Sequence, residues 1–96
     1  MRIMVEYLGH IRQVIGSTRE EEVEIVDDAS IADLLMVLSE KYGTPFKKAV
    51  FERSSADVKP NYIITVNGYL LNQLDGIKTK LKSGDHVTLL PIVSGG

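Results

Sequence analysis

The segment from Ser30 to Pro45 constrains the fold most strongly, because it carries the start, the body and the end of one amphipathic helix. Asp33 stands three residues after Ser30, which is the capping-box spacing of a helix N-terminus. The apolar residues that follow recur at helical spacing and are Ile31, Leu34, Leu35 and Leu38. Gly43 is a typical C-terminal stop, and Pro45 is expected to prevent the helix from resuming. We therefore predict a helix over residues 31–42 with one apolar face.

Strand-like alternation of apolar and polar residues appears on both sides of this helix. The segments that show it are residues 2–8, 21–28, 62–66 and 86–92. Asn67-Gly68 predicts a type I′ turn from residues 62–66 into a short strand at 69–71, because both central residues of that turn need a positive φ. The order strand, strand, helix, hairpin, strand indicates an α+β fold with a mixed sheet packed on one main helix. We expect residues 1–8 to pair in parallel with residues 86–92.

The size and charge of the chain limit the kinds of function that it is expected to have. A chain of 96 residues forms one domain, here residues 1–96, and has no room for a cleft between domains. The net charge of −2 gives no general attraction to nucleic acid or to an anionic membrane. The N-terminus lacks the pattern of a signal peptide, and the chain has no apolar run of membrane-spanning length. We therefore expect a cytoplasmic protein that binds neither nucleic acid nor membrane.

The usual constellations of catalytic residues are missing from the sequence. The chain has no cysteine, so no thiol can act as a nucleophile. His10 and His86 are the only histidines, and we interpret both as surface residues, so no metal site is expected. Glu22 and Glu24 are interpreted as a solvated strand face. The chain is therefore not expected to be a catalyst alone, nor to bind a cofactor of its own.

The terminal pair Gly95-Gly96 is the remaining candidate for chemistry. A free carboxylate at Gly96 becomes reactive once a partner converts it to an acyl-adenylate. Glycine has no Cβ, so two glycines can thread a narrow channel and adopt backbone angles closed to other residues. An extended tail from Ile92 to Gly96 would reach on the order of 15 Å beyond the body of the domain. We interpret residues 93–96 as a flexible, reactive tail.

Four stretches of the chain form a recognisable set: VEYLGHIRQVIG (5–16), DDASIADLLMVL (27–38), ITVNG (64–68) and LKSGDHVTLLPIVSGG (81–96). Together they resemble the MoaD family of sulfur carriers, within the ubiquitin-like β-grasp group that includes ThiS. The last stretch is the most specific, since it combines a Gly-Asp turn, an alternating strand, a proline and terminal Gly-Gly. The resemblance implies a ubiquitin-like β-grasp fold, and it leaves the role of residues 44–60 open.

The resemblance also implies a mechanism, as the small subunit of molybdopterin synthase. Gly96 would be adenylated, at the expense of ATP, by a ubiquitin-activating-like enzyme of the MoeB type. It would then become a thiocarboxylate and deliver sulfur within a large subunit of the MoaE type, for molybdenum cofactor biosynthesis. The residues implied to bind these partners are Leu8, Leu70, Leu90, Pro91, Val93 and Ser94. Leu70 is equally compatible with the core, whereas Leu8 and Leu90 alternate away from the predicted core positions.

Two other functions fit the same sequence. A ubiquitin-like protein modifier would join Gly96 to lysines of target proteins through isopeptide bonds. A plain β-grasp binding module would carry the glycine pair without using it. A ThiS-like role in thiazole synthesis fits less well, because ThiS chains are shorter and lack a segment like residues 44–60. The first two functions need the same activated carboxylate, so the sequence separates them poorly.

Overall fold

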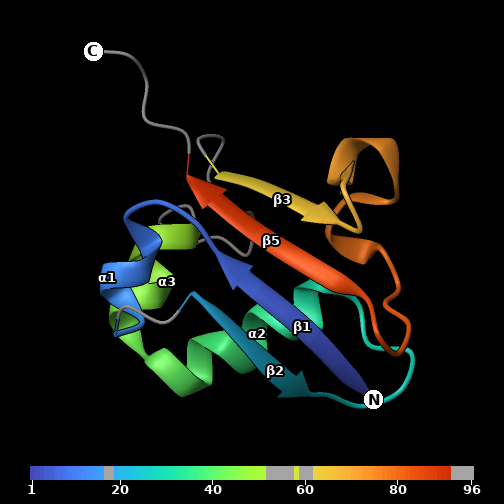
Figure 1. The fold of residues 1–96 in the computed structure, drawn as a ribbon, viewed down its shortest axis with the longest axis horizontal. Helices are drawn as coiled ribbons and strands as arrows, with labels where there is room; N and C mark the ends of the chain where they lie inside the picture. The colour runs from blue at the N-terminus through green and yellow to red at the C-terminus, as the bar shows by residue number, and fades with distance from the viewer. Residues whose placement is uncertain (17–18, 52–57, 59–61, 92–96) are drawn as a thin grey trace.

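The computed structural model describes residues 1–16, 19–51, 58 and 62–91, and these form a sheet with helices on one side (Figure 1). The strands are β1 (Arg2–Tyr7), β2 (Glu20–Glu24), β3 (Tyr62–Val66), β4 (Tyr69–Leu70) and β5 (His86–Pro91). The helices are α1 (Ile11–Val14), α2 (Ile31–Tyr42) and α3 (Thr44–Val50), with short 3₁₀ turns at Leu71–Gln73 and Gly76–Lys78. None of the helices in these ranges is long and apolar enough to cross a membrane.

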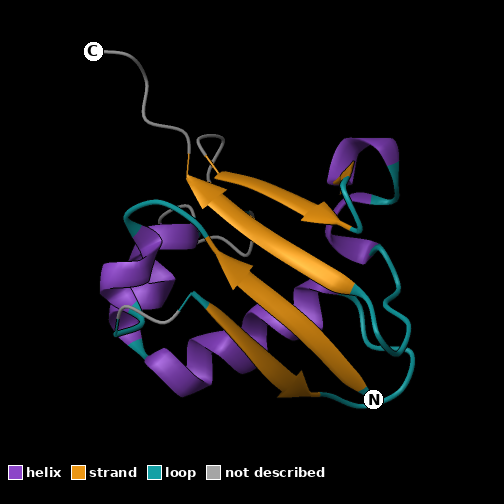
Figure 2. Ribbon diagram, in the orientation of Figure 1, coloured by secondary structure: helices purple, strands orange, loops and turns teal. Residues whose placement is uncertain are grey.

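The sheet has the strand order β2-β1-β5-β3-β4. Strand β5 lies between β1, to which it is parallel, and β3, to which it is antiparallel. The predicted parallel pairing of the first and last strands is therefore confirmed, with Met4–Tyr7 beside His86–Leu89. Figure 2 shows α2 crossing behind this mixed sheet. The ubiquitin-like β-grasp architecture expected from the sequence is thus present.

The main helix has the predicted bounds because its end signals are local. The Ser30 side chain accepts a hydrogen bond from the Asp33 backbone N–H, and the Asp33 carboxylate accepts one from the Ser30 N–H. Gly43 has a φ of 78°, which favours glycine, and its N–H bonds back to the Ser39 carbonyl. As expected, α2 does not resume after Gly43, and a separate helix, α3, contains Pro45. This proline lies in the first turn of α3, where its missing N–H has no helical partner to lose.

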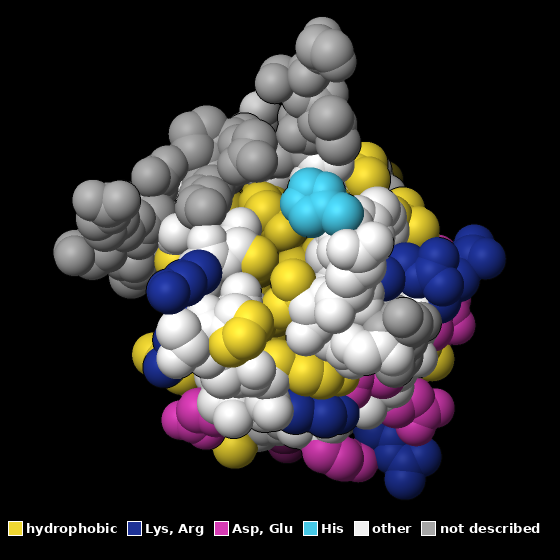
Figure 3. Space-filling model, turned by 90° about the vertical axis from the view of Figure 1, so that its left-hand side faces the viewer, with side chains coloured by type: hydrophobic (Ala, Val, Ile, Leu, Met, Phe, Trp, Pro, Cys, Tyr) yellow, Lys and Arg dark blue, Asp and Glu magenta, His cyan; other side chains and the backbone are white. Residues whose placement is uncertain are grey.

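The core lies between the sheet and α2. Its fully buried large side chains are Tyr7, Phe46, Ile3, Ile11, Ile31, Leu34, Leu35, Leu38, Leu89, Val5, Val50 and Val87. They include the predicted inward face of β1 and the predicted apolar stripe of α2. Seen from the side of α1 and α3, apolar surface gathers in the middle of the face, and charged side chains lie below it and on both sides (Figure 3). The helices therefore cover the sheet on one side, and the opposite side of the sheet forms the outer face.

The hairpin between β3 and β4 also follows the prediction. Asn67 and Gly68 both have positive φ angles, as a type I′ turn requires. The second strand is one residue shorter than expected, because Leu71 already belongs to a 3₁₀ turn. The loop predicted at residues 53–60 lies outside the described residues except for Val58, which forms an isolated bridge with Phe51.

A polar cluster ties β2 to the end of α2. Glu21 is only 11% exposed and accepts hydrogen bonds from the Tyr7 hydroxyl (2.7 Å), the Tyr42 hydroxyl and the Lys41 ammonium group. Burial alone raises the pKa of Glu21, but the hydrogen bonds from Lys41, Tyr42 and Tyr7 outweigh it and hold the pKa below its usual value. Burial raises the pKa of Tyr7, and its bond to Glu21 raises it further. The cluster therefore holds an ionised carboxylate against neutral tyrosines.

Candidate functional site

The candidate site begins where β5 ends, at Pro91. Four of the residues predicted to carry function, Val93, Ser94, Gly95 and Gly96, lie outside the described residues. The structure does place the strand that leads to them. Because β5 is paired on both sides, Pro91 is held opposite Tyr62 of β3 at the end of the sheet. The chain therefore leaves the sheet from its central strand.

Apolar side chains lie on the outer face beside this exit. Leu90 is 36% exposed and lies opposite Ile63 of β3. Leu8 follows β1 and continues its pairing, because its N–H donates to the Leu89 carbonyl at 3.0 Å. Leu70 is exposed and lies opposite Thr65, one row further along the sheet. We call Leu8, Ile63, Leu70 and Leu90 the outer apolar surface.

The sequence named three of these four side chains. It missed Ile63, although the alternation of residues 62–66 places it on the face opposite the buried Tyr62 and Ile64. For Leu70, which the sequence left between core and surface, the structure gives an exposed position. Leu8 is half-buried, so it contributes only part of its side chain to this surface.

Pro91 occupies a different environment from these leucines. Its side chain is buried, so it is not part of the exposed surface. Gly9, in the turn after β1, lies directly against it. A Cβ added at Gly9 would lie 3.3 Å from Pro91 Cγ, and the φ of Gly9 is +71°. Close packing against a bare backbone therefore fixes the last described residue of β5.

A pocket of about 360 Å³ opens along the edge of β3 beside the outer apolar surface. Its lining includes Val58, Tyr62, Ile64, Leu70 and Leu71. The Tyr62 hydroxyl is buried and has no hydrogen-bond partner among the described residues, and burial raises the pKa of Tyr62. Among the described residues, the lining is mainly apolar and includes no carboxylate, imidazole or amine.

Comparison with known proteins finds a family model and relatives that agree with one another. Residues 5–96 match the family model described as the ThiS family. The chain is 29% identical to small archaeal modifier protein 3 of Haloferax volcanii over 96 residues, which covers 100% of both chains. It is 28% identical to a candidate sulfur carrier protein of Archaeoglobus fulgidus over 82 residues, which covers 84% of this chain and 91% of the relative.

A solved structure gives the same result. The chain is similar to a candidate molybdopterin converting factor, subunit 1, from Pyrococcus furiosus, with a TM-score of 0.76 and 30% identity. The match covers 97% of this chain and 99% of that one. The matched range, the β-grasp sheet and the full-length relatives agree with the resemblance found in the sequence. The chain belongs to the ThiS family of sulfur carriers and ubiquitin-like small modifiers.

Proposed function

We propose that this protein is a sulfur carrier that acts as the small subunit of molybdopterin synthase, with Gly96 as its reactive residue. The path of β5 carries this proposal. The strand is fixed on both sides and ends at Pro91, beside the outer apolar surface. A partner that covers this surface would receive the following residues at a defined place. The name of the Archaeoglobus relative supports a sulfur carrier, and the name of the Pyrococcus relative supports a role with molybdopterin.

The chemistry takes place on the main chain. In the first step the Gly96 carboxylate attacks the α-phosphate of ATP in the site of a MoeB-type enzyme and releases pyrophosphate. A sulfur nucleophile supplied by a partner then displaces AMP and leaves a thiocarboxylate. In a MoaE-type large subunit that sulfur passes to a pterin precursor. Gly95 keeps the approach to the reacting carbon free of side chains. Because the first step consumes ATP, we expect the protein to work in the cytoplasm.

Docking in this proposal depends on the outer apolar surface and the start of the tail. Leu8, Leu70 and Leu90 would lose water-exposed apolar area to the partner, which favours association. Val93 and Ser94 would enter the partner's channel behind Gly95 and Gly96. Pro91, buried against Gly9, would set the direction in which the tail leaves the sheet.

A second function is favoured by one specific observation. A relative that matches over the full length of both chains is named as a small archaeal modifier protein. A modifier would use the same adenylated Gly96 but pass its acyl group to the amine of a target lysine. Both functions thus share the activation step and differ in the nucleophile that accepts the chain.

Intact-mass spectrometry of protein from its native cell tests the proposal. A sulfur carrier is expected to show a fraction heavier by the difference between sulfur and oxygen, and this fraction should shift on alkylation of the thiocarboxylate. A modifier is expected to yield lysine peptides branched with residues from its own C-terminus. Branched peptides without any thiocarboxylate would overturn the sulfur-carrier assignment, and the absence of both products would overturn the two functions together.

A further inference from the structure

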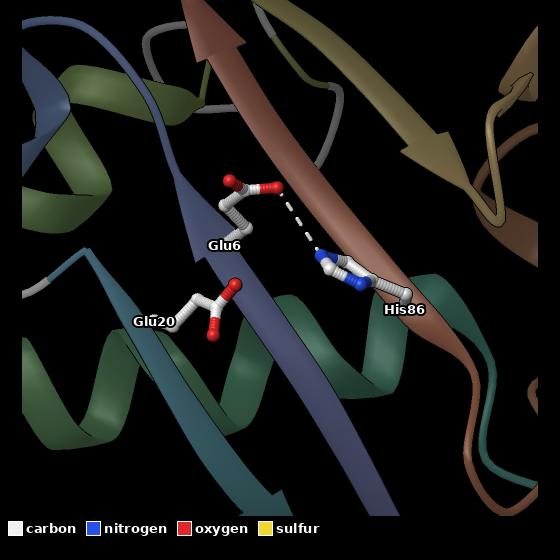
Figure 4. Close-up of side chains that lie close together, drawn as sticks. All are labelled: Glu6, Glu20 and His86. Atoms are coloured by element: carbon white, nitrogen blue, oxygen red, sulfur yellow. Dashed lines mark hydrogen bonds and ion pairs between the residues drawn. The ribbon is translucent and has the colours of Figure 1, made fainter.

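Three potential metal ligands converge on the outer face of the sheet. Figure 4 shows the side chains of Glu6, Glu20 and His86 pointing toward one another from neighbouring strands. Their ligand atoms all lie within 4.8 Å of one another. The closest pair is His86 Nε2 and Glu6 Oε1, at 3.2 Å. This cluster therefore differs from a simple patch of acidic residues, because an imidazole nitrogen faces the carboxylates.

The register of the sheet fixes this arrangement. Glu6 of β1 lies directly opposite Glu20 of β2. On its other side Glu6 is paired with Thr88 of β5, so His86 stands two residues away on the same face. Strand β1 has partners on both sides, and Glu6 is only 19% exposed. Because β1 and β5 are each paired on both sides, their backbones hold Glu6 and His86 in register, which lowers the entropic cost of binding an ion.

The observed distance suits a metal better than a strong hydrogen bond. Zinc bonds of about 2.0–2.1 Å in a tetrahedral site place neighbouring ligand atoms about 3.3–3.4 Å apart. The 3.2 Å between His86 and Glu6 is close to this spacing, and it is long for a charge-assisted hydrogen bond. Glu20 is exposed and can close its remaining distance by rotating its side chain.

The charges at the cluster also favour a cation. Two carboxylates that lie directly opposite each other on adjacent strands repel. The Arg19 guanidinium lies 3.7 Å from Glu6 Oε2 and offsets part of this repulsion, while Oε1 faces the histidine. A divalent ion between Glu6 and His86 would offset the rest of this repulsion. Imidazole with carboxylates is a ligand set used by zinc, whereas magnesium prefers oxygen ligands alone.

We propose that Glu6, Glu20 and His86 form a zinc-binding site on the outer face of the sheet. The three residues supply three ligands and leave a fourth position open to water or to a group from a partner. The site adjoins the outer apolar surface. Leu8 follows Glu6 by two residues, and Leu90 follows Thr88, the residue of β5 paired with Glu6, by two residues. It does not depend on activation of Gly96.

The test is a Zn²⁺ titration of the full chain, free of any histidine tag, followed by calorimetry and by NMR of the imidazole nitrogens. We expect one zinc ion per chain and a shift of the His86 Nε2 resonance, with the His10 resonances unchanged. His86→Gln and Glu6→Gln should each weaken binding by about tenfold or more, since even loss of an outer-shell partner costs about 10–100-fold. Mg²⁺ should not shift the imidazole resonances.

Two matched variants separate ligation from general attraction. His10→Gln removes the only other imidazole, and Glu40→Gln removes one negative charge from an exposed position on α2. Both should bind zinc as the unchanged chain does. The proposal is overturned if His86→Gln retains full affinity, if Glu40→Gln weakens binding as much as Glu6→Gln, or if zinc shifts His10 in the unchanged chain. The last measurement needs no variant, so it stands even if a substitution impairs folding.

Discussion

The Tyr7 hydroxyl donates a 2.7 Å hydrogen bond to Glu21, which links the middle of the sheet to its edge strand. Tyr7 is fully buried, and Glu21 also accepts hydrogen bonds from Tyr42 and Lys41 of α2. One carboxylate thus joins three elements: β1, β2 and the last turn of α2. It satisfies a buried hydroxyl that would otherwise cost free energy in the folded state.

Glu21→Gln should therefore destabilise the fold. In Glu21 one carboxylate oxygen accepts the hydrogen bond from Lys41, and the other accepts those from Tyr7 and Tyr42. An amide has only one oxygen, so the donors on one side would face its NH₂ group, which cannot accept. We expect the free energy of unfolding to fall by about 1–3 kcal/mol, measured by urea denaturation. Glu22→Gln is the matched control, because Glu22 is exposed, and it should change the value by no more than about 0.5 kcal/mol. Equal effects from both variants would contradict the role of the cluster.

The same carboxylate should make stability depend on pH. Its folded pKa is lower than the ordinary value of 4.5 expected for the unfolded chain, so the unfolded chain binds the proton more readily. The contribution of Glu21 is then complete above pH 4.5 and is lost as the pH falls through the folded pKa. We expect the difference in the free energy of unfolding between the unchanged chain and Glu21→Gln to shrink below pH 4.5, as measured by urea denaturation at several acid pH values. A constant difference would argue against an ionised Glu21.

Leu90→Glu should separate docking from folding. Leu90 is 36% exposed on the outer face, so the substitution should cost about 1 kcal/mol or less in stability. Docking would bury the new charge without a partner, which should weaken binding to the activating enzyme about tenfold or more. Val26→Glu is the control, since Val26 is 73% exposed and follows β2. If Leu90→Glu unfolds the domain, or if Val26→Glu binds as poorly, the docking assignment is wrong.

Deletion of Gly96 should separate activity from stability. A terminal glycine buries no apolar side chain, so thermal unfolding should be nearly unchanged. The carboxylate would then stand one residue, about 3.5 Å, short of the activating site, and adenylation should be lost. ATP–pyrophosphate exchange with the cognate activating enzyme measures this, with the full-length chain as reference. Equal exchange by both chains would remove the basis of the sulfur-carrier and modifier functions alike.

Gly9→Ala should test the contact with Pro91. Alanine at Gly9 would be strained by the positive φ and would also press its Cβ against Pro91. Gly16→Ala is a matched control, because Gly16 has a φ of +86° but, its chain neighbours aside, no atom of the described residues lies within 4 Å of the added Cβ. Both variants should lose about 1 kcal/mol or more in thermal or urea unfolding, and Gly9→Ala should lose more. Equal losses would mean that the contact with Pro91 contributes nothing.

The sequence predicted those parts of the fold whose causes are local. The helix over residues 31–42 has the predicted bounds because Ser30, Asp33 and Gly43 act within one turn of its ends. The hairpin follows from the positive φ angles that Asn67-Gly68 accepts. The main helix ends before Pro45, as expected, and proline also suits the first turn of the separate helix α3.

The sequence patterns could not predict the side-chain clusters on the sheet, because these clusters depend on the register between strands. Glu21 shares the face of Val23 by simple alternation, so its inward position could have been found, but its tyrosine and lysine partners could not. His86 was expected to be an ordinary surface residue, and only the pairing of β1 with β5 brings it to Glu6. Leu90 and Leu8 could be assigned to the outer face, since both follow from alternation along a strand.

The central position of β5 has a consequence for biosynthesis. Residues 86–91 leave the ribosome after the other described strands, yet they separate β1 from β3 in the finished sheet. A nascent chain that lacks them leaves the facing edges of β1 and β3 unpaired and their inward side chains without Val87 and Leu89. Folding must then wait until nearly the whole domain has been synthesised, and a chain truncated before β5 should be recognised by proteases and chaperones as unfolded.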